Sequence, residues 1–121
     1  IAGKVSGFVK FMADSSFIYH SGETPLYDPV SRFCCIPDLA GHIGSFAVCI
    51  DIKGGGKLPF HQLQTAAQAI ALRANGFKVE RRYALYLKDD DYKLEEHTDR
   101  SDENRWRALV AAYWAREFYT K

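Results

Sequence analysis

The stretch FCCIPDLAGHIGSFAVCIDIKGGG, residues 33–56, decides how this chain folds. It holds two apolar runs of strand length around a short turn with glycine, which is the pattern of a β-hairpin. Each run carries an acid where a buried strand favours an apolar residue: Asp38 in the first run and Asp51 in the second. Lys53 follows two residues after Asp51, so both side chains lie on one face of their strand. Pairing of the two runs would bring Asp38 to the same face.

Two chemical interpretations fit these three residues. Burial of an unpaired carboxylate costs on the order of several kcal/mol, so acids in central strands are paired or hold a cation. One acid from each of two strands, with a lysine beside them, is typical of an oxygen-rich site for a hard cation such as Mg²⁺. The alternative is a buried Asp51–Lys53 ion pair with Asp38 at the solvent edge. The spacing alone leaves both open.

The rest of the sequence places this hairpin in an α/β domain. Residues 22–33 contain Pro25 and Pro29 and are extended or edge-like. Helical spacing of apolar residues predicts a helix at each end of the chain and a third helix between the strands. Gly76 marks the end of this third helix. The expected elements are a helix in 3–15, a hairpin in 31–53 with its turn at 41–45, a helix in 60–75, strands in 78–87 and 93–98, and a helix in 103–119. This order predicts a mixed sheet with helices packed on it.

The composition narrows the function classes. The chain has 121 residues, of which 47% are hydrophobic, and we treat it as one domain, 1–121. It has no apolar run long enough to span a membrane and no signal-peptide pattern. Three cysteines without CxxC spacing argue against a zinc site or a disulfide framework and suit a reducing cytosol, so we expect a cytoplasmic protein. A net charge of +1 is compatible with a local basic face but excludes a surface that is basic throughout.

Several further residues have a structural and a functional interpretation. The tryptophans at 106 and 114 have helical spacing with apolar neighbours, which favours core positions over base-stacking platforms. His97 is expected at the surface, whereas His61 starts a helix near the predicted site. The basic residues around the second helix's end form either a solvated face or a phosphate-tracking edge. These are Arg73, Lys78, Arg81 and Arg82.

The central motif resembles a known family. Pro37-Asp38, followed by Asp51-Ile52-Lys53, resembles the PD-(D/E)xK signature of the restriction-endonuclease-like nuclease superfamily. In the RecB-like and phage-exonuclease branch, the D/E-x-K strand leads through a glycine-bearing loop into a helix with a Gln and small residues. Here residues 54–56 are all glycine, and the next helix carries Gln64 followed by Thr-Ala-Ala. The resemblance covers residues 5–116.

The resemblance implies a fold, an activity and a set of roles. The fold would be an α/β/α sandwich around a mixed sheet. The activity would be an exonuclease-type hydrolysis of DNA phosphodiesters that depends on Mg²⁺ or Mn²⁺. A phage-encoded member would act in the host cytoplasm. An inactive nuclease-fold module that only binds DNA is the alternative. The implied metal ligands are Glu23, Asp38, Asp51 and the Ile52 carbonyl; Lys53 would position the attacking water and stabilise charge, and Gln64 would contact substrate or order the site.

Overall fold

The structure, a computed structural model, describes residues 2–120 and is built around a mixed sheet. The sheet has five strands in the order β1-β4-β5-β6-β7. They are β1 (Ile18–Ser21), β4 (Leu39–Ile43), β5 (Phe46–Lys53), β6 (Arg81–Lys88) and β7 (Asp91–His97). Neighbouring strands are antiparallel except for β5 and β6, which are parallel and joined through helix α2 (His61–Ala74). This arrangement confirms the expected α/β class with a mixed central sheet.

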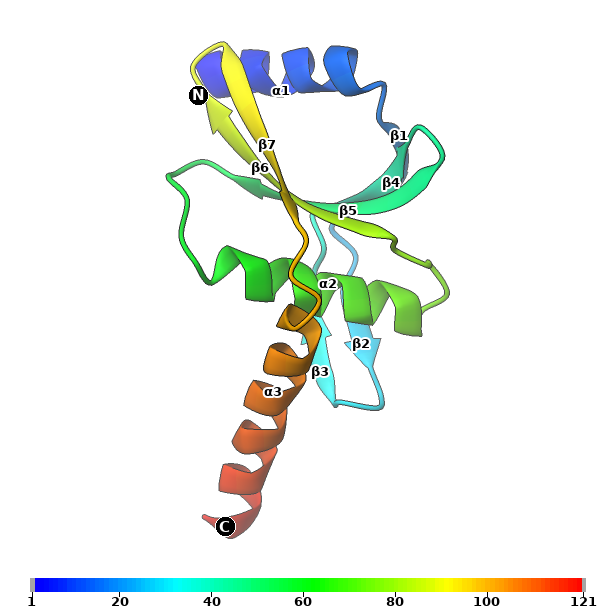
Figure 1. The fold of residues 1–121 in the computed structure, drawn as a ribbon, viewed down its shortest axis with the longest axis vertical. Coiled ribbons are helices and arrows are strands. Elements are labelled where there is room, and N and C mark those ends of the chain that lie inside the picture. Colours follow the sequence, from blue (N-terminus) through cyan, green and yellow to red (C-terminus); the bar gives the residue numbers. More distant parts are fainter. Residues whose placement is uncertain (1, 121) are drawn as a thin grey trace.

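Helices flank both faces of this sheet. Helix α1 (Ala2–Ser15) lies on one face and α2 on the other (Figure 1). The buried cluster on the α1 side consists of Phe11, Phe17, Val48, Ile50, Tyr83 and Leu85. The buried cluster on the α2 side consists of Ala40, Cys49, Ala69, Leu72 and Val79. The two apolar layers therefore hold the sheet between the helices.

Strand β5 sets the direction in which the motif residues point. Val48 and Ile50 belong to the cluster on the α1 side, and Cys49 between them belongs to the cluster on the α2 side. Because strand side chains alternate between the faces, Asp51 and Lys53 lie on the same face as Cys49, towards α2. The sequence prediction that these two residues share a face is confirmed.

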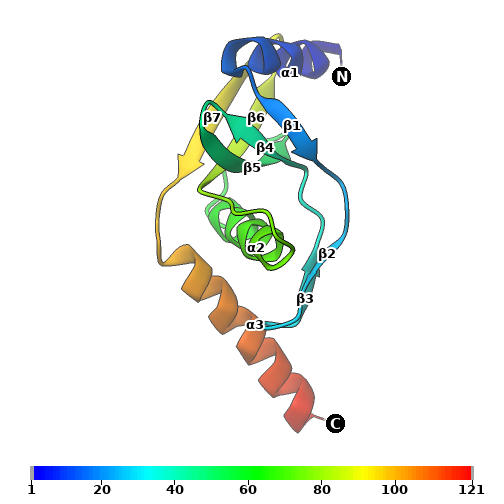
Figure 2. The same cartoon turned by 90° about the vertical axis from the view of Figure 1, so that its right-hand side faces the viewer.

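Helix α2 is buried on more than one side. Its Ala66, Ala69 and Ala71 are fully buried, and such small side chains let neighbouring elements approach closely. Beyond α2, on the side away from the sheet, lie the hairpin of β2 (Leu26–Asp28) and β3 (Phe33–Cys35) and helix α3 (Asp102–Tyr119). Figure 2 shows the hairpin and α3 on opposite sides of α2, converging below it.

The predicted first strand of the central hairpin is wrong in its extent. Residues 33–35 form β3 and pair with β2, whereas the partner of β5 begins only at Leu39. Pro37 lies between the two segments and has no N–H to donate to a sheet ladder, so the chain changes sheets there. Strand β1 pairs with β4 at the sheet edge and was not predicted.

Helix α3 extends away from the body and does not pack as predicted. Leu109 and Tyr113 of its expected apolar face are 53% and 54% exposed. Within the described residues of α3, only Asp102 and Val110 are buried. Trp106 and Trp114 are partly buried, so their predicted core positions are wrong. The first turn of the helix makes polar contacts with the body, through Asp102 and Glu103.

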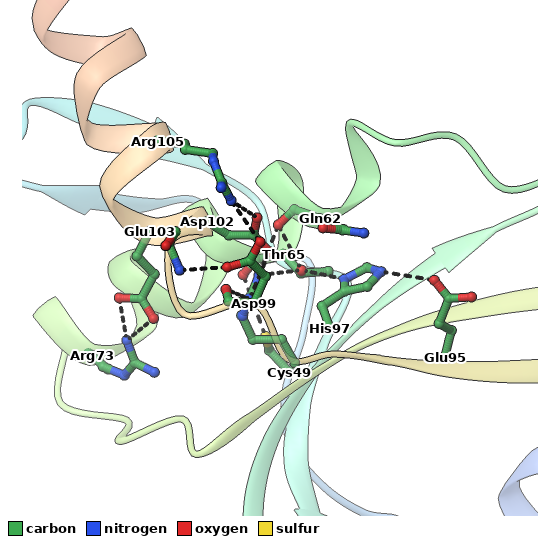
Figure 3. Close-up of polar contacts among 12 residues, drawn as sticks. Cys49, Gln62, Thr65, Arg73, Glu95, His97, Asp99, Asp102, Glu103 and Arg105 are labelled. Carbon is green, nitrogen blue, oxygen red and sulfur yellow. Dashed lines mark hydrogen bonds and ion pairs between the residues drawn. The ribbon is translucent and has the colours of Figure 1, made fainter.

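A buried arginine attaches the start of α3 to α2 and β6. Arg82 is 6% exposed, and its guanidinium pairs with Asp102 Oδ2 at 3.0 Å. The same guanidinium donates to the carbonyl of Gln62 in α2 at 2.9 Å. Figure 3 shows Asp102 at this junction, and beside it Arg73 of α2, which donates two hydrogen bonds to Glu103 at 2.7 and 2.8 Å. Arg82 is therefore buried and belongs neither to a solvated face nor to a free phosphate-binding edge, whereas Arg73 is exposed and paired with Glu103.

Breaking this contact is expected to loosen α3. Asp102→Ala leaves the Arg82 guanidinium buried without its carboxylate, and the loss of one partner of a buried pair costs about 3–5 kcal/mol of unfolding free energy. Urea unfolding followed by circular dichroism measures the change. Asp99→Ala is the control, because the Asp99–Arg105 pair nearby is half exposed and its loss should cost much less. Equal losses in the two variants would contradict the role given to Arg82.

Candidate metal centre

The two motif carboxylates lie opposite each other at the carboxyl end of β5. Leu39 in β4 pairs with Ile50 in β5, so the antiparallel register places Asp38, just before β4, opposite Asp51. Directly opposed residues lie on the same face of a sheet. That face is the one that α2 covers. Antiparallel pairing with β4 thus brings together two acids that are thirteen positions apart in the sequence.

Asp38 is fixed by the backbone of β5. Its Oδ2 accepts a hydrogen bond from the Ile52 N–H at 2.7 Å. Because the N–H and C=O of one strand residue point to the same neighbouring strand, the Ile52 carbonyl is directed to the Asp38 side as well. Oxygen atoms of Asp38, Asp51 and Ile52 thus border one region.

Lys53 bridges the sheet and helix α2. Its Nζ forms an ion pair with Asp51 Oδ2 at 2.8 Å, and it donates a hydrogen bond to Gln64 Oε1 at 2.5 Å. Asp51 is 5% exposed, whereas Lys53 is partly exposed. The structure therefore brings Asp38, Asp51, Lys53 and Gln64 together.

The environment of Asp38 favours its protonated form. Burial is the main cause, and the hydrogen bond with the Asp51 carboxyl is the second, while the Ile52 N–H acts in the opposite direction. Together they raise the pKa of Asp38 to about 6. Two carboxyl groups that share one site resist simultaneous ionisation. A cation between them would relieve this repulsion.

The site opens into a cleft of about 240 Å³ between β5, α2 and α3. Within the described chain, the buried Gln68 Oε1 has no hydrogen-bond donor, whereas the buried Asp51 Oδ2 is paired with the Lys53 ammonium. Hard divalent cations such as Mg²⁺ take oxygen ligands of this type, so the residues present fit such an ion. The cleft is lined by Cys34, Cys35, Asp51, Lys53, Gln64, Ala67, Gln68 and Trp106.

Glu23, the third predicted acid, does not join this group. Its N–H donates to the Pro37 carbonyl at 2.8 Å, so its backbone lies near Asp38, but the residue is exposed. Its φ of 51° lies in the left-handed region, which a sequence pattern does not reveal for a glutamate. In residues 2–120, no group of three or more His, Cys, Asp or Glu side chains is placed to hold a metal. The site consists of two carboxylates and a backbone carbonyl.

His61 and Gln68 are neighbours that the motif does not include. His61 Nδ1 lies 2.9 Å from the Tyr86 hydroxyl. Burial, and then the charge of Lys53, lower the pKa of His61, so its imidazole is neutral at pH 7. Gln68, which stands where many members of the resembled family have a tyrosine, follows Gln64 by one helical turn, so both side chains line the cleft.

A second constellation resembles a nucleophile, base and acid but is closed to solvent. Thr65 Oγ1 lies 2.7 Å from His97 Nδ1, and His97 Nε2 lies 3.8 Å from Glu95 (Figure 3). Thr65 is fully buried and His97 is 5% exposed, so a substrate cannot reach either. The predicted surface position of His97 is wrong. These residues join α2 to β7 and have a structural role.

The raised pKa of Asp38 has a consequence for the pH dependence of metal binding. Between about pH 4, the ordinary pKa of an aspartate, and about pH 6, the folded protein keeps the Asp38 proton that the unfolded chain loses. The free energy of unfolding therefore falls as the pH rises through that window.

A metal at this site needs the ionised form of Asp38, so Mn²⁺ affinity should fall about tenfold for each pH unit below 6. Calorimetric titrations at about pH 5 and about pH 7 measure this. Equal affinities would remove Asp38 from the ligand set.

No helix within residues 2–120 is both long enough and apolar enough to cross a membrane. A comparison of the chain with protein-family models gave no match, and neither did a comparison with curated proteins. The geometry of the site is therefore the evidence on function.

Proposed function

We propose that this chain is a metal-dependent nuclease with a restriction-endonuclease-like fold that hydrolyses DNA phosphodiesters. One observation carries the proposal: Asp38, Asp51, Lys53 and Gln64 converge at the carboxyl end of β5, beside a cleft. Hydrolysis of a phosphodiester needs charge stabilisation and a positioned water more than it needs covalent chemistry. Two carboxylates can hold a cation that positions the water, and the adjacent ammonium can stabilise the negative charge.

The residues divide these tasks. Asp38, Asp51 and the Ile52 carbonyl would hold Mg²⁺ or Mn²⁺, and the Ile52 N–H already orients the Asp38 carboxylate. When bound, the ion polarises a phosphate oxygen and makes water more acidic. The Lys53 ammonium stabilises the negative charge that develops on the phosphate, and Gln64 orients that ammonium through its amide oxygen.

Two alternatives would contain the same residues without being a nuclease. The 2.8 Å contact between Lys53 and Asp51 is also what a purely structural ion pair would make. A nuclease fold that only binds DNA would keep the same acids without turnover. The three cases differ in their metal response, because only the nuclease cleaves when metal is added.

The experiment is a digestion of end-labelled single- and double-stranded DNA with Mg²⁺, with Mn²⁺, and with a chelator alone. The proposal predicts cleavage with either metal and none with the chelator. DNA binding without cleavage in either metal would favour the binding module. Neither binding nor cleavage, together with a melting temperature that metal does not raise, would favour the structural ion pair.

A further inference from the structure

An aromatic groove continues directly from the candidate metal centre. It has a volume of about 490 Å³ and lies between the β2–β3 hairpin and the exposed side of α3. Cys34 and Trp106 line both this groove and the cleft at Asp51 and Lys53, so the two spaces share a wall. Its aromatic and charged side chains are Tyr27, Arg32, Phe33, Trp106, Tyr113 and Trp114.

The rings of this groove are partly exposed and held in defined positions. Trp106 and Phe33 meet edge to face, with ring centres 5.3 Å apart. Trp114 donates its indole N–H to the Arg32 carbonyl at 2.9 Å, and its neighbour Tyr113 is 54% exposed. Open π-faces on a fixed frame suit the stacking of unpaired bases, which is worth about 1–3 kcal/mol per base.

Arg32 gives the groove a positive charge. Within the described structure it is the only charged residue that lines the groove, and its guanidinium lies 4.3 Å from the centre of the Trp114 ring. The turn before it is fixed by Asp28, whose carboxylate accepts hydrogen bonds from the N–H groups of Val30 and Ser31. Arg32 has a φ of 63°, an uncommon conformation for arginine that this turn imposes. The charge is therefore held where a phosphate would pass.

An unsatisfied donor lies at the junction of the two spaces. The indole N–H of Trp106 is buried and has no acceptor within the described chain. A buried polar group without a partner is costly and calls for an explanation. An oxygen of a phosphate or a base that passes from the groove to the cleft would accept this hydrogen bond.

We infer that this groove binds single-stranded nucleic acid and leads a strand to the metal centre. This inference rests on the proposed nuclease function, and it specifies the substrate as an unpaired strand. Aromatic faces, one cation and an unpaired N–H fit the bases and phosphates of a single strand. The bases of a duplex already stack on each other and cannot use these rings.

The chain contains its own probe for this groove. Its two tryptophans, Trp106 and Trp114, both line the groove, so tryptophan fluorescence reports on the groove and, through Trp106, on its junction with the cleft. Titration in a chelator, with a single strand of about 12 nucleotides, separates binding from cleavage. We expect saturable quenching by the single strand and at least roughly tenfold weaker binding of the same sequence as a blunt duplex.

Two variants test the contacts. Tyr113→Ala removes one exposed ring, and Arg32→Asn removes the charge with a residue that tolerates a positive φ. Each should weaken binding of the single strand roughly 5- to 100-fold. Phe118→Ala is the control, because this side chain is 75% exposed on the same helix and lies outside the groove. It should bind like the parent, and circular dichroism verifies that all three variants are folded.

The outcomes separate this inference from the nuclease proposal. Cleavage with metal, but no saturable quenching, would overturn the groove and leave the nuclease. Quenching that depends on Tyr113 and Arg32, without cleavage in any metal, would support the groove and reject the nuclease. Equal binding of strand and duplex would overturn the inference. The inference would also be overturned if the parent is a dimer, Tyr113→Ala dissociates it, and single strands leave the fluorescence unchanged. The groove would then be an interface between two copies of the chain.

Discussion

Replacement of Asp51 by asparagine is expected to remove most metal binding and to lower DNA cleavage by at least roughly 10³-fold. The carboxylate is 5% exposed and belongs to the pair that would hold the ion. Asparagine keeps the shape of the side chain but carries no charge. Calorimetry with Mn²⁺ measures the binding, and a single-turnover assay measures the cleavage.

Asp90→Asn is the matched control for this variant. It makes the same chemical change in the exposed turn between β6 and β7, where asparagine tolerates the φ of 57°. Its metal affinity and cleavage rate should equal those of the parent. Unchanged Mn²⁺ affinity in Asp51→Asn would show that the ion, if it binds, does so elsewhere.

Replacement of Lys53 by alanine separates an enzyme from a structural ion pair. In the nuclease, the ammonium stabilises charge on the phosphate, and its loss should lower turnover by roughly 10²-fold or more. Metal binding should persist and even strengthen, because a nearby positive charge is gone. In a structural ion pair, the same change leaves Asp51 buried and unpaired, which costs about 3–5 kcal/mol of unfolding free energy with no activity to lose.

Lys57→Ala provides the control for this experiment. Lys57 lies in the exposed loop after β5 and pairs with Glu95 at 3.0 Å, away from the two motif acids. Its loss removes one positive charge from the same region without touching Asp51. A Lys53→Ala protein that cleaves as fast as Lys57→Ala would exclude the catalytic role of Lys53.

Strong local periodicity made part of the fold predictable. The hairpin of β4 and β5 and helix α2 follow from alternating and helical apolar patterns, and both are present. The same alternation placed Asp51 and Lys53 on one face, and the hairpin brought Asp38 opposite them. Gln64 lies two residues before the fully buried Ala66 of α2, so its approach to Lys53 depends on the rotation of that helix.

Tertiary contacts decided the features that the sequence did not predict. The short exposed strand β1 depends on pairing with β4 and has no apolar alternation of its own. His97 is buried because Thr65 of α2, distant in the sequence, hydrogen-bonds to it. The apolar residues of α3 have helical spacing, but spacing cannot tell a core face from a groove wall. For this reason Trp106 and Trp114 were expected in the core.

The most direct test of the metal-dependent nuclease is a side-by-side digestion of labelled single-stranded DNA by the parent protein, Asp51→Asn and Asp90→Asn with Mn²⁺. We expect the parent and Asp90→Asn to cut the strand at the same rate, a chelator to stop both, and Asp51→Asn to leave the strand intact. Cleavage by Asp51→Asn at the parent rate, or no cleavage by any of the three proteins, would contradict it.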